Sequence, residues 1–418
     1  MSKDGLSRPL PAPPLGRKVP LSKPLRHARF RQLWIANLIS NLGTWTQTFA
    51  AAWLIATVST SAATSSLVQT ATYVPVFLFA LFAGVIADAV NRPKFLFLCN
   101  VFMAVCACLM AALVMSGQAA AGPVLALTFC LGSGAAFMWP AWQASMTGLV
   151  EPDEVEAAAT LNNLSYNVAA IIGPALGGVL FAWVGAGALF LINAVSFIGL
   201  MAVYWFWWRE QDAPVLPART GFMRSLRAGL AAALGCARYR HILLNVTTVF
   251  FATIAFAALL PVFVKNVLQL SSGVFGLLMG SLGVGAVAGA LMLPTIRQHV
   301  GRTRLLAGAL FVYGIMLVAL SFVRSLAVLV PLIVAAGMAW SATVSTLNAA
   351  AQMSFTPAIR ARTLSIYLFV MAAGYTLGSL LWGRVADGFG VQAAFAAAGA
   401  CVLVNGAVLI SGKRETPI

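Results

Sequence analysis

The residue types that carry acid–base, nucleophilic and metal chemistry are few in this sequence and lie far apart. The 418 residues include ten acids, three histidines and six cysteines. The cysteines form no Cys-x-x-Cys pair and have no histidine at metal-ligand spacing, so we interpret them as small apolar filler. No Ser-His-Asp set and no nucleotide-binding loop occurs. We therefore expect no enzyme, no cofactor and no metal site.

One cluster of charged residues has a spacing that suits a reversible contact between helices. It occupies the segment 84–94, between two apolar stretches, and combines Gly84, Asp88, Arg92 and Lys94. Gly84 permits close helix packing, and Asp88 can accept hydrogen bonds from the amides that begin a neighbouring helix. Arg92 and Lys94 can pair with a carboxylate across the loop. The alternative interpretation is a charged turn with no further role.

A similar spacing recurs in the second half, where Gln298, Arg302 and Arg304 connect two apolar segments. Gln298 replaces the acid, so this copy has no carboxylate. Other matches between the halves join Gln143 with Gln352, and Gly173-x3-Gly177 with Gly374-x3-Gly378. Together they indicate an internal duplication with two parallel halves, an architecture that builds a central cavity between two bundles.

Polar residues inside the apolar segments recur at spacings that place them on single helix faces. A polar side chain is unfavourable in lipid unless it faces protein or water, so such faces predict a cavity or hydrogen-bonded helix contacts. We interpret the recurrent residues as a substrate cavity: Asn37, Asn41, Thr44, Thr48, Trp139, Gln143, Asn245, Thr248, Ser341, Ser345, Asn348 and Gln352. Hydrogen bonding between helices is the alternative for each of them.

A glycine–proline motif occupies the middle of one apolar segment, at Gly173, Pro174, Gly177 and Gly178. Proline removes one backbone hydrogen bond and bends a helix. The glycines permit tight contact with a facing helix. The motif therefore predicts a bent, closely packed helix, and ordinary packing is the alternative interpretation.

Long charge-free stretches predict the membrane-spanning helices that carry these residues. Residues 32–87, 95–150 and 157–208 contain no Asp, Glu, Lys or Arg, and each is long enough for two crossings of about 20 residues. The second half repeats this rhythm. The predicted spans are 33–57, 67–87, 95–116, 122–147, 158–183, 187–208, 242–264, 273–296, 304–323, 326–352, 363–383 and 391–411.

Composition excludes a soluble chain. Hydrophobic residues make up 61% of the sequence and charged residues only 9%, against roughly 25% in soluble proteins. The net charge of +16 is explained by basic residues in cytoplasmic loops rather than by nucleic acid. Both termini are then cytoplasmic. Of the lysines and arginines, only Lys265, Arg324 and Arg384 lie on the outer side. The acidic run 151–156 is expected to be a solvated cytoplasmic loop and helix start.

The expected fold is an all-α membrane protein of twelve transmembrane helices in two pseudo-symmetric six-helix bundles. The predicted boundaries are a basic cytoplasmic tail at 1–32, bundles at 33–208 and 242–411, and a C-terminal tail at 412–418. Between the bundles, residues 209–241 are expected to form a cytoplasmic linker whose segment 221–239 is a basic amphipathic helix able to meet anionic lipid.

The segment 84–94 resembles the signature loop of the major facilitator superfamily, and residues 173–178 are similar to the antiporter motif of its drug exporters. Leu33-Trp34, residues 41–45, Pro140-Ala141-Trp142-Gln143 and the connection around Pro357 resemble the branch that includes the enterobactin exporter and macrolide-efflux proteins. The resemblance covers roughly residues 29–411 and implies the major facilitator fold. It also implies that Gly84, Asp88, Arg92 and Lys94, with Gln298, Arg302 and Arg304, latch the two halves in one state.

The resemblance further implies a multi-pass protein of the bacterial cytoplasmic membrane that exports a small amphiphilic molecule, such as a siderophore or a macrolide, by alternating access. The expected partners are this substrate, the lipid bilayer and protons, with no nucleic acid, and the expected state is a monomer. Many relatives carry protons on a buried carboxylate, but no acid here lies at mid-membrane. Uncoupled export or facilitated uptake, and a membrane sensor or lipid-handling protein, remain the alternatives.

Overall fold

The computed structural model describes residues 20–146, 148–209, 222–355 and 357–411, and all regular structure in these ranges is helical. The first half begins with a short 3-10 helix, η1 (Lys23–Arg26). A second 3-10 helix, η2 (Pro152–Glu154), precedes the last helix of this half. The longer helices are α1 (Ala28–Val58), α2 (Ala62–Ala89), α3 (Arg92–Met115), α4 (Ala121–Met146) and α5 (Val155–Arg209).

Local sequence explains where these helices begin and turn. The side chains of Ser61 and Asn91 accept hydrogen bonds from the amides of Thr64 and Lys94, which caps the N-termini of α2 and α3. Helix α5 is two helices joined at Gly185, whose φ of 74° lies in the left-handed region that glycine adopts without strain. This break falls between the predicted spans 158–183 and 187–208.

The second half consists of α6 (Phe222–Gly235), α7 (Ala237–Val262), the π-helical turn η3 (Phe263–Val267), α8 (Ser272–His299), α9 (Arg302–Ala319), α10 (Leu326–Met353), α11 (Pro357–Phe389) and α12 (Val391–Ser411). The predicted linker helix 221–239 is wrong at its C-terminal end. It stops at Gly235, the residue type with low helix propensity, and Cys236 is extended. Arg238 and Arg240 therefore belong to α7.

By length and composition, nine helices in the described part of the chain can cross a membrane. They run from α3 to α12, with α5 and η2 counted together as one and α6 excluded. Helix α6 has only 14 residues, which is too short for the hydrocarbon layer. The helical membrane class expected from the sequence is thus confirmed.

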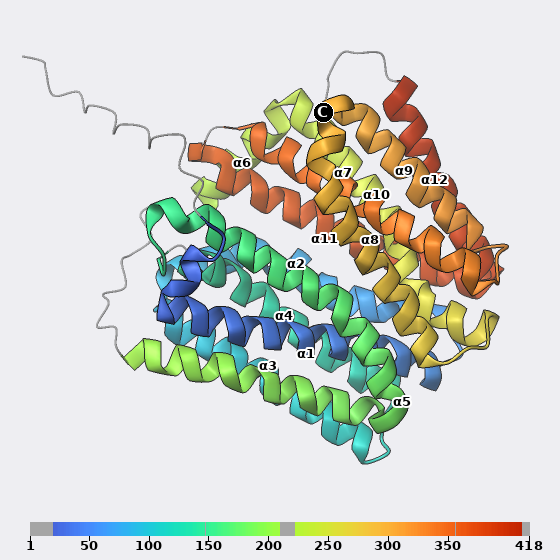
Figure 1. The fold of residues 1–418 in the computed structure, drawn as a ribbon, viewed down its shortest axis with the longest axis horizontal. Coiled ribbons are helices and arrows are strands. Elements are labelled where there is room, and N and C mark those ends of the chain that lie inside the picture. The colour runs from blue at the N-terminus through green and yellow to red at the C-terminus, as the bar shows by residue number, and fades with distance from the viewer. Residues whose placement is uncertain (1–19, 147, 210–221, 356, 412–418) are drawn as a thin grey trace, which may run out of the picture.

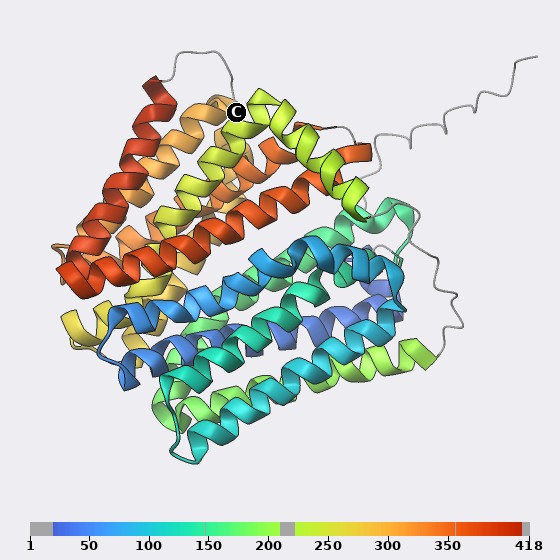
Figure 2. The same ribbon diagram turned by 180° about the vertical axis from the view of Figure 1, so that it is seen from behind.

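The helices are arranged as two bundles, with α1–α5 in one and α7–α12 in the other (Figure 1). In the first bundle α1 and α3 pack on α5, and α2 packs on α4. In the second, α7 packs on α11, α9 on α12, and α8 on α10. The main contacts between the bundles are α2 with α11 and α5 with α8. Figure 2 shows α2 and α11 meeting near the α1–α2 turn and diverging toward their other ends.

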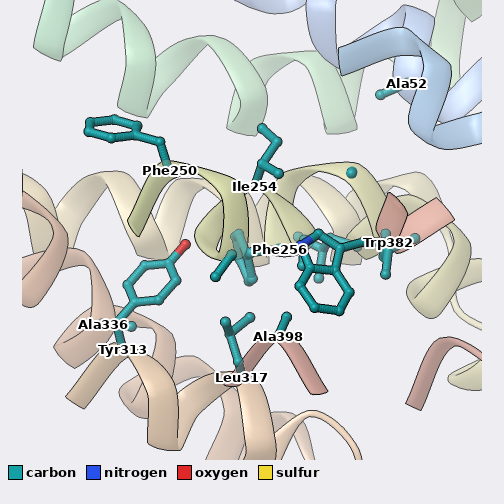
Figure 3. Close-up of a cluster of buried hydrophobic side chains, with 14 of the residues drawn as sticks. Ala52, Phe250, Ile254, Phe256, Tyr313, Leu317, Ala336, Trp382 and Ala398 are labelled. Atoms are coloured by element: carbon teal, nitrogen blue, oxygen red, sulfur yellow. The ribbon is translucent and has the colours of Figure 1, made fainter. Parts of the chain in front are cut away.

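The largest apolar core surrounds α7, most of whose side chains are buried. Figure 3 shows side chains of this core from α7 and its neighbours, among them Phe250, Ile254, Phe256, Tyr313, Leu317, Ala336, Trp382 and Ala398. The indole nitrogen of Trp382 donates to the Phe251 carbonyl oxygen over 2.7 Å. Helix α7 is therefore packed against other helices on several sides, and this packing fixes which residues its polar side chains contact.

Candidate functional site

The predicted stripe on α1 divides between helix contacts and open positions. Asn37 is buried, and its Nδ2 donates to Oδ1 of Asn162 on α5 over 3.1 Å. Thr44 is exposed, with its Oγ1 3.5 Å from Oδ1 of Asn193. Asn41 and Thr48 are half-buried. The face therefore forms hydrogen bonds to α5 and also presents polar atoms beside that contact.

A buried polar network lies next to this stripe and was missed in the sequence. Nδ2 of Asn193 donates to Oε1 of Gln47 over 2.5 Å, and both residues are buried. The hydroxyl of Ser196 donates to the Asn193 carbonyl oxygen over 2.7 Å. A Cβ at Gly43 would lie 2.6 Å from that hydroxyl oxygen, so glycine lets α1 approach α5 here. Gln47 could have been found as an amide inside a charge-free span, but it falls outside the helical phase of the stripe.

The predicted stripe on α10 is partly exposed. Gln352 is exposed, and its Nε2 donates to Oδ1 of half-buried Asn348 over 2.6 Å. Ser341 and Ser345 are half-buried on the same helix. These four residues therefore stay together on one face, as expected from their spacing, and two of them are already hydrogen-bonded to each other.

Arg297 of α8 contacts α10, although it is not among the site residues predicted from the sequence. Nη2 of half-buried Arg297 donates to Oγ1 of buried Thr346 over 3.3 Å. The Arg297 Nε atom is buried and has no hydrogen-bond partner among the described residues. Thr346 neighbours Ser345 of the stripe. The structure thus sets a positive charge against α10, at a residue next in sequence to the stripe.

The two remaining predicted pairs differ from each other. Trp139 and Gln143 are exposed on α4, in line with a cavity face. On α7, however, Oγ1 of Thr248 accepts a hydrogen bond from Nδ2 of Asn405 on α12, and Nδ2 of Asn245 donates to the His241 carbonyl oxygen. Thr248 therefore lies on the side of α7 that packs against α12, and no hydrogen bond among the described residues joins the α7 pair to the other stripes. The spacing of Asn245 and Thr248 predicted that they share a face of α7, but it did not predict that this face contacts α12.

The predicted latch is described only in part. Gly84 and Asp88 lie in α2, but their side chains lie outside the described part of the structure. Arg92 begins α3 and is exposed, and the Lys94 ammonium lies 5.2 Å from the centre of the Trp208 ring. In the second half the side chains of Gln298, Arg302 and Arg304 are exposed.

The predicted helix-bend motif lies at helix contacts. Gly173, Pro174, Gly177 and Gly178 are all buried. A Cβ at Gly178 would lie 2.9 Å from the Ser272 carbonyl oxygen and 3.1 Å from Cα of Gly276, both on α8. A Cβ at Gly173 or Gly177 would instead meet α1. Gly178 thus lies where the two bundles touch, at the contact of α5 with α8, whereas Gly173 and Gly177 lie at a contact within the first bundle.

A surface pocket at the edge of the first bundle lies apart from these residues. It is formed where α1 begins and α5 ends, and it is lined by Arg29, Gln32, Leu33, Leu149, Ala202, Val203, Phe206 and Trp207. None of the predicted cavity residues takes part in it. The described residues also contain no group of three or more His, Cys, Asp or Glu side chains placed to hold a metal ion.

Comparison with known proteins connects this arrangement to a transporter family. The model of the transmembrane secretion effector family, MFS_3, matches residues 20–415. The staphyloferrin A transporter of Staphylococcus aureus is 24% identical over 363 residues, covering 86% of this chain and 89% of the relative. The multidrug efflux pump Tap of Mycolicibacterium fortuitum is 23% identical over 380 residues, with 86% and 89% covered.

Solved transporters share the fold at low sequence identity. The nucleoside transporter NupG has a TM-score of 0.70 at 12% identity, covering 93% of this chain and all of that one (100%). A bacterial homologue of the iron transporter ferroportin, in an inward-facing state, has a TM-score of 0.67 at 15% identity, with 93% and 99% covered. The fold predicted from the signature loop is thus shared with known transporters of small molecules and ions.

Proposed function

The chain belongs to the transmembrane secretion effector family of the major facilitator superfamily, and from this we propose that it exports a small amphiphilic molecule by alternating access. Members are membrane transporters rather than enzymes, and the chain is a multi-pass protein of the bacterial cytoplasmic membrane. The observation that carries the proposal is a family match that spans both bundles. The names of the relatives, a siderophore transporter and a multidrug efflux pump, support export of such a compound.

The proposed topology has twelve spans with both termini in the cytoplasm. The nine candidates give this number when α5 is counted as two helices at Gly185 and when α1 and α2 are added. Basic residues support the orientation, because they gather in the tail, the α2–α3 and α8–α9 connections and the linker. The proposed domain boundaries are a bundle on either side of the linker, with the second bundle beginning at Ala237, the start of α7, rather than at residue 242.

The proposed substrate path lies between the bundles, along the exposed polar residues of α1, α4 and α10. Thr44, Gln143 and Gln352 are exposed on these helices, and Arg297 adds a positive charge beside α10. The spans carry no acid at their centres. A cavity with a cation and no anion favours a neutral, zwitterionic or anionic substrate, because a cationic one would find no opposite charge.

The proposed inner latch is the segment 84–94 with Gln298, Arg302 and Arg304. Its support is the match of Gly84, Asp88, Arg92 and Lys94 to the superfamily pattern. Arg92 and Lys94 lie at the start of α3, where the α2–α3 connection turns on the proposed cytoplasmic side. A latch there would stabilise one state of the cycle and not the substrate itself.

Facilitated, uncoupled movement is the second candidate function. No carboxylate lies at the middle of a span, where it could carry a proton. Glu154 lies in η2, and Asp387 lies two positions before the end of α11. Proton-linked members of a transport family need a titratable group along the path. A pathway without one would equilibrate its substrate instead of concentrating it.

Flux in proteoliposomes separates these functions. The purified protein is reconstituted, and a panel of siderophores and macrolides is offered with and without an imposed pH gradient. Proton-coupled export predicts concentrative flux that collapses with an ionophore. Flux that only equilibrates, and is unchanged by the ionophore, would establish the uncoupled pathway. Binding without flux for every compound would reject both transport proposals.

A further inference from the structure

The turn between α1 and α2 is held by two charged residues of the opposite bundle. At the start of α2, the carboxylate of Asp387 accepts from the Ala62 amide over 2.5 Å and from the Ser61 hydroxyl over 2.6 Å. At the end of α1, the Lys265 ammonium donates to the carbonyl oxygens of Ala56 over 2.6 Å and Thr57 over 3.2 Å. Two helix ends of the first bundle are therefore capped from the second.

The sign of each charge fits the helix end that it contacts. The first amides of a helix and its last carbonyl groups have no partner within the helix, and the helix dipole is positive at its N-terminus and negative at its C-terminus. An acid at the start of α2 and a lysine at the end of α1 are both favourable. Hydrogen bonds to ionised groups are also stronger than neutral ones. Exchanging the two charges would make both contacts repulsive.

Contacts between α2 and α11 continue inward from this turn. The hydroxyl oxygens of Thr70 and Ser379 lie 2.7 Å apart. The rings of Tyr73 and Tyr375 then stack with centroids 4.3 Å apart, and those of Phe77 and Phe369 follow at 4.6 Å. Figure 2 shows the two helices diverging beyond this seam. The charged caps therefore close the end of a continuous seam between the bundles.

A second set of contacts between the bundles, of α8 with α5 and α1, lies at the same end of the molecule. The Ser272 hydroxyl, at the start of α8, donates to the Gly178 carbonyl oxygen over 3.3 Å. The ring of Phe275 stacks on those of Phe49 and Trp53 of α1, with centroids 4.6 and 5.6 Å apart. These contacts are apolar or neutral. Asp387 and Lys265 supply the charged contacts of this closure.

We propose that Asp387 and Lys265 are positioning residues that hold the outer end of the transporter closed by capping the two helix ends of the α1–α2 turn. The assignment of this end as outer rests on the proposed topology. A substrate can leave on this side only when the bundles separate, so both caps must break in each cycle. Their strength sets how much of the protein is closed on the outside and ready to receive substrate from the cytoplasm.

The test measures opening directly. Ser379 is fully buried in the seam, so Ser379→Cys reports separation of α2 from α11 by its reaction with a membrane-impermeant maleimide. Labelling is followed in whole cells and in inverted vesicles, with the reaction of the six native cysteines measured in the parent protein and subtracted. The variants are Asp387→Asn, Lys265→Gln and the milder Ser61→Ala. Arg324→Gln is the matched control, because Arg324 is an exposed cation of the same bundle that lies over Phe263 and not on α1.

The expected result is about tenfold faster labelling from outside the cell in Asp387→Asn and Lys265→Gln, since each removes a charge-assisted contact. Ser61→Ala is expected to raise the rate less, and Arg324→Gln not at all. Lys265→Arg keeps a cation that can donate and should restore slow labelling. In flux assays the two charge variants should raise the KM for substrate on the cytoplasmic side more than they lower kcat, because fewer molecules face inward.

Two results would overturn the proposal. Only the second would also reject the proposed topology and direction of transport. Unchanged labelling on both sides of the membrane, in variants that are inserted at normal amounts, removes the gate and leaves the proposed export intact. Faster labelling only in inverted vesicles means that this end faces the cytoplasm. That outcome rejects the outer gate together with the topology on which the proposed direction depends.

Discussion

Nε2 of His27 lies 2.7 Å from Oε2 of Glu154, although α1 to α4 separate the two residues in the chain. Lys23 adds a cation, with its Nζ 3.0 Å from Oε1 of the same carboxylate. The Glu154 side chain is only 1% exposed. The expectation that residues 151–156 form a solvated loop and helix start is therefore wrong at this residue, because η1 folds over η2. The N-terminal segment and the α4–α5 connection are tied together at one carboxylate.

Replacing Glu154 should free the N-terminal segment. Glu154→Gln keeps the size of the side chain but removes the charge that both His27 and Lys23 contact, and it leaves a buried amide among donors. We expect trypsin to cleave after Arg26 at least about threefold faster, since cleavage follows local opening. The exposed Glu156, changed to Gln, is the control for loss of one acid. Equal cleavage in both variants and the parent would contradict a role for this contact.

Acid should release the same contact. Burial alone would raise the pKa of Glu154, but hydrogen bonds from Lys23 and His27 outweigh it and hold the pKa below its ordinary value of 4.5. A carboxyl group whose folded pKa is lowered stabilises the fold above its unfolded pKa, and this contribution is lost as pH falls through the folded value. The tie should therefore weaken below pH 4.5.

Hydrogen exchange of residues 23–27 in detergent, followed from neutral pH downward, measures this release after correction for intrinsic rates. An acid-induced rise in exchange is expected in the parent and should be absent from Glu154→Gln, which has no carboxyl group to protonate. The same rise in both proteins would assign the effect to other groups. Lys23, whose pKa is raised mainly by its hydrogen bond to Glu154, loses its contribution only at strongly alkaline pH.

A single methyl group at Gly178 should interfere with closure of the bundles. The added Cβ of Gly178→Ala would lie 2.9 Å from a backbone oxygen of Ser272, so α5 and α8 would have to separate. Overpacking of this kind costs about 1–3 kcal/mol, which corresponds to roughly a 5- to 150-fold shift away from the closed state. Transport in vesicles and maleimide labelling of Ser379→Cys measure the shift.

Gly308→Ala on α9 is the matched control for this change, because a Cβ there has no heavy atom within 4 Å. It adds the same methyl group to a membrane helix without a facing helix to meet. If both variants transport and label as the parent does, the close approach of Gly178 to α8 has no role in the cycle.

Arg297 should distinguish substrates by charge. Arg297→Gln keeps a donor near Thr346 but removes the positive charge beside the α10 stripe. A cation near an anionic ligand contributes about 1.5–3 kcal/mol through charged hydrogen bonds, so the KM for an anionic siderophore should rise about tenfold or more. The KM for a neutral macrolide should change little, because no opposite charge is lost.

The control for this variant is Arg324→Gln, which removes an exposed cation that lies over the Phe263 ring. Competition between the two substrate classes in one vesicle preparation gives the ratio of their KM values without depending on the amount of protein. An equal loss for both classes would show that Arg297 supports the helices and does not select the substrate.

Much of the fold follows from local sequence. A charge-free apolar stretch forms a helix in lipid because its backbone groups must pair within the segment. The predicted ends of 391–411 match α12, and the break at Gly185 follows from a glycine between two spans. Thr48 and Gln352 lie on the helices and faces that their spacing gave. These properties depend on residues within one or two turns.

The sequence by itself determined the membrane class, the helices and the phase of each polar stripe, because hydropathy and helical period are local properties. Only the tertiary structure decided what each face meets. It directed Thr248 to Asn405, joined Asn193 to Gln47, and buried Glu154 under the N-terminal segment. It also brought Asp387 and Lys265 to the two helix ends of one turn. Such pairs join residues far apart in the chain, and helix packing within and between the bundles, rather than any local pattern, sets their distance.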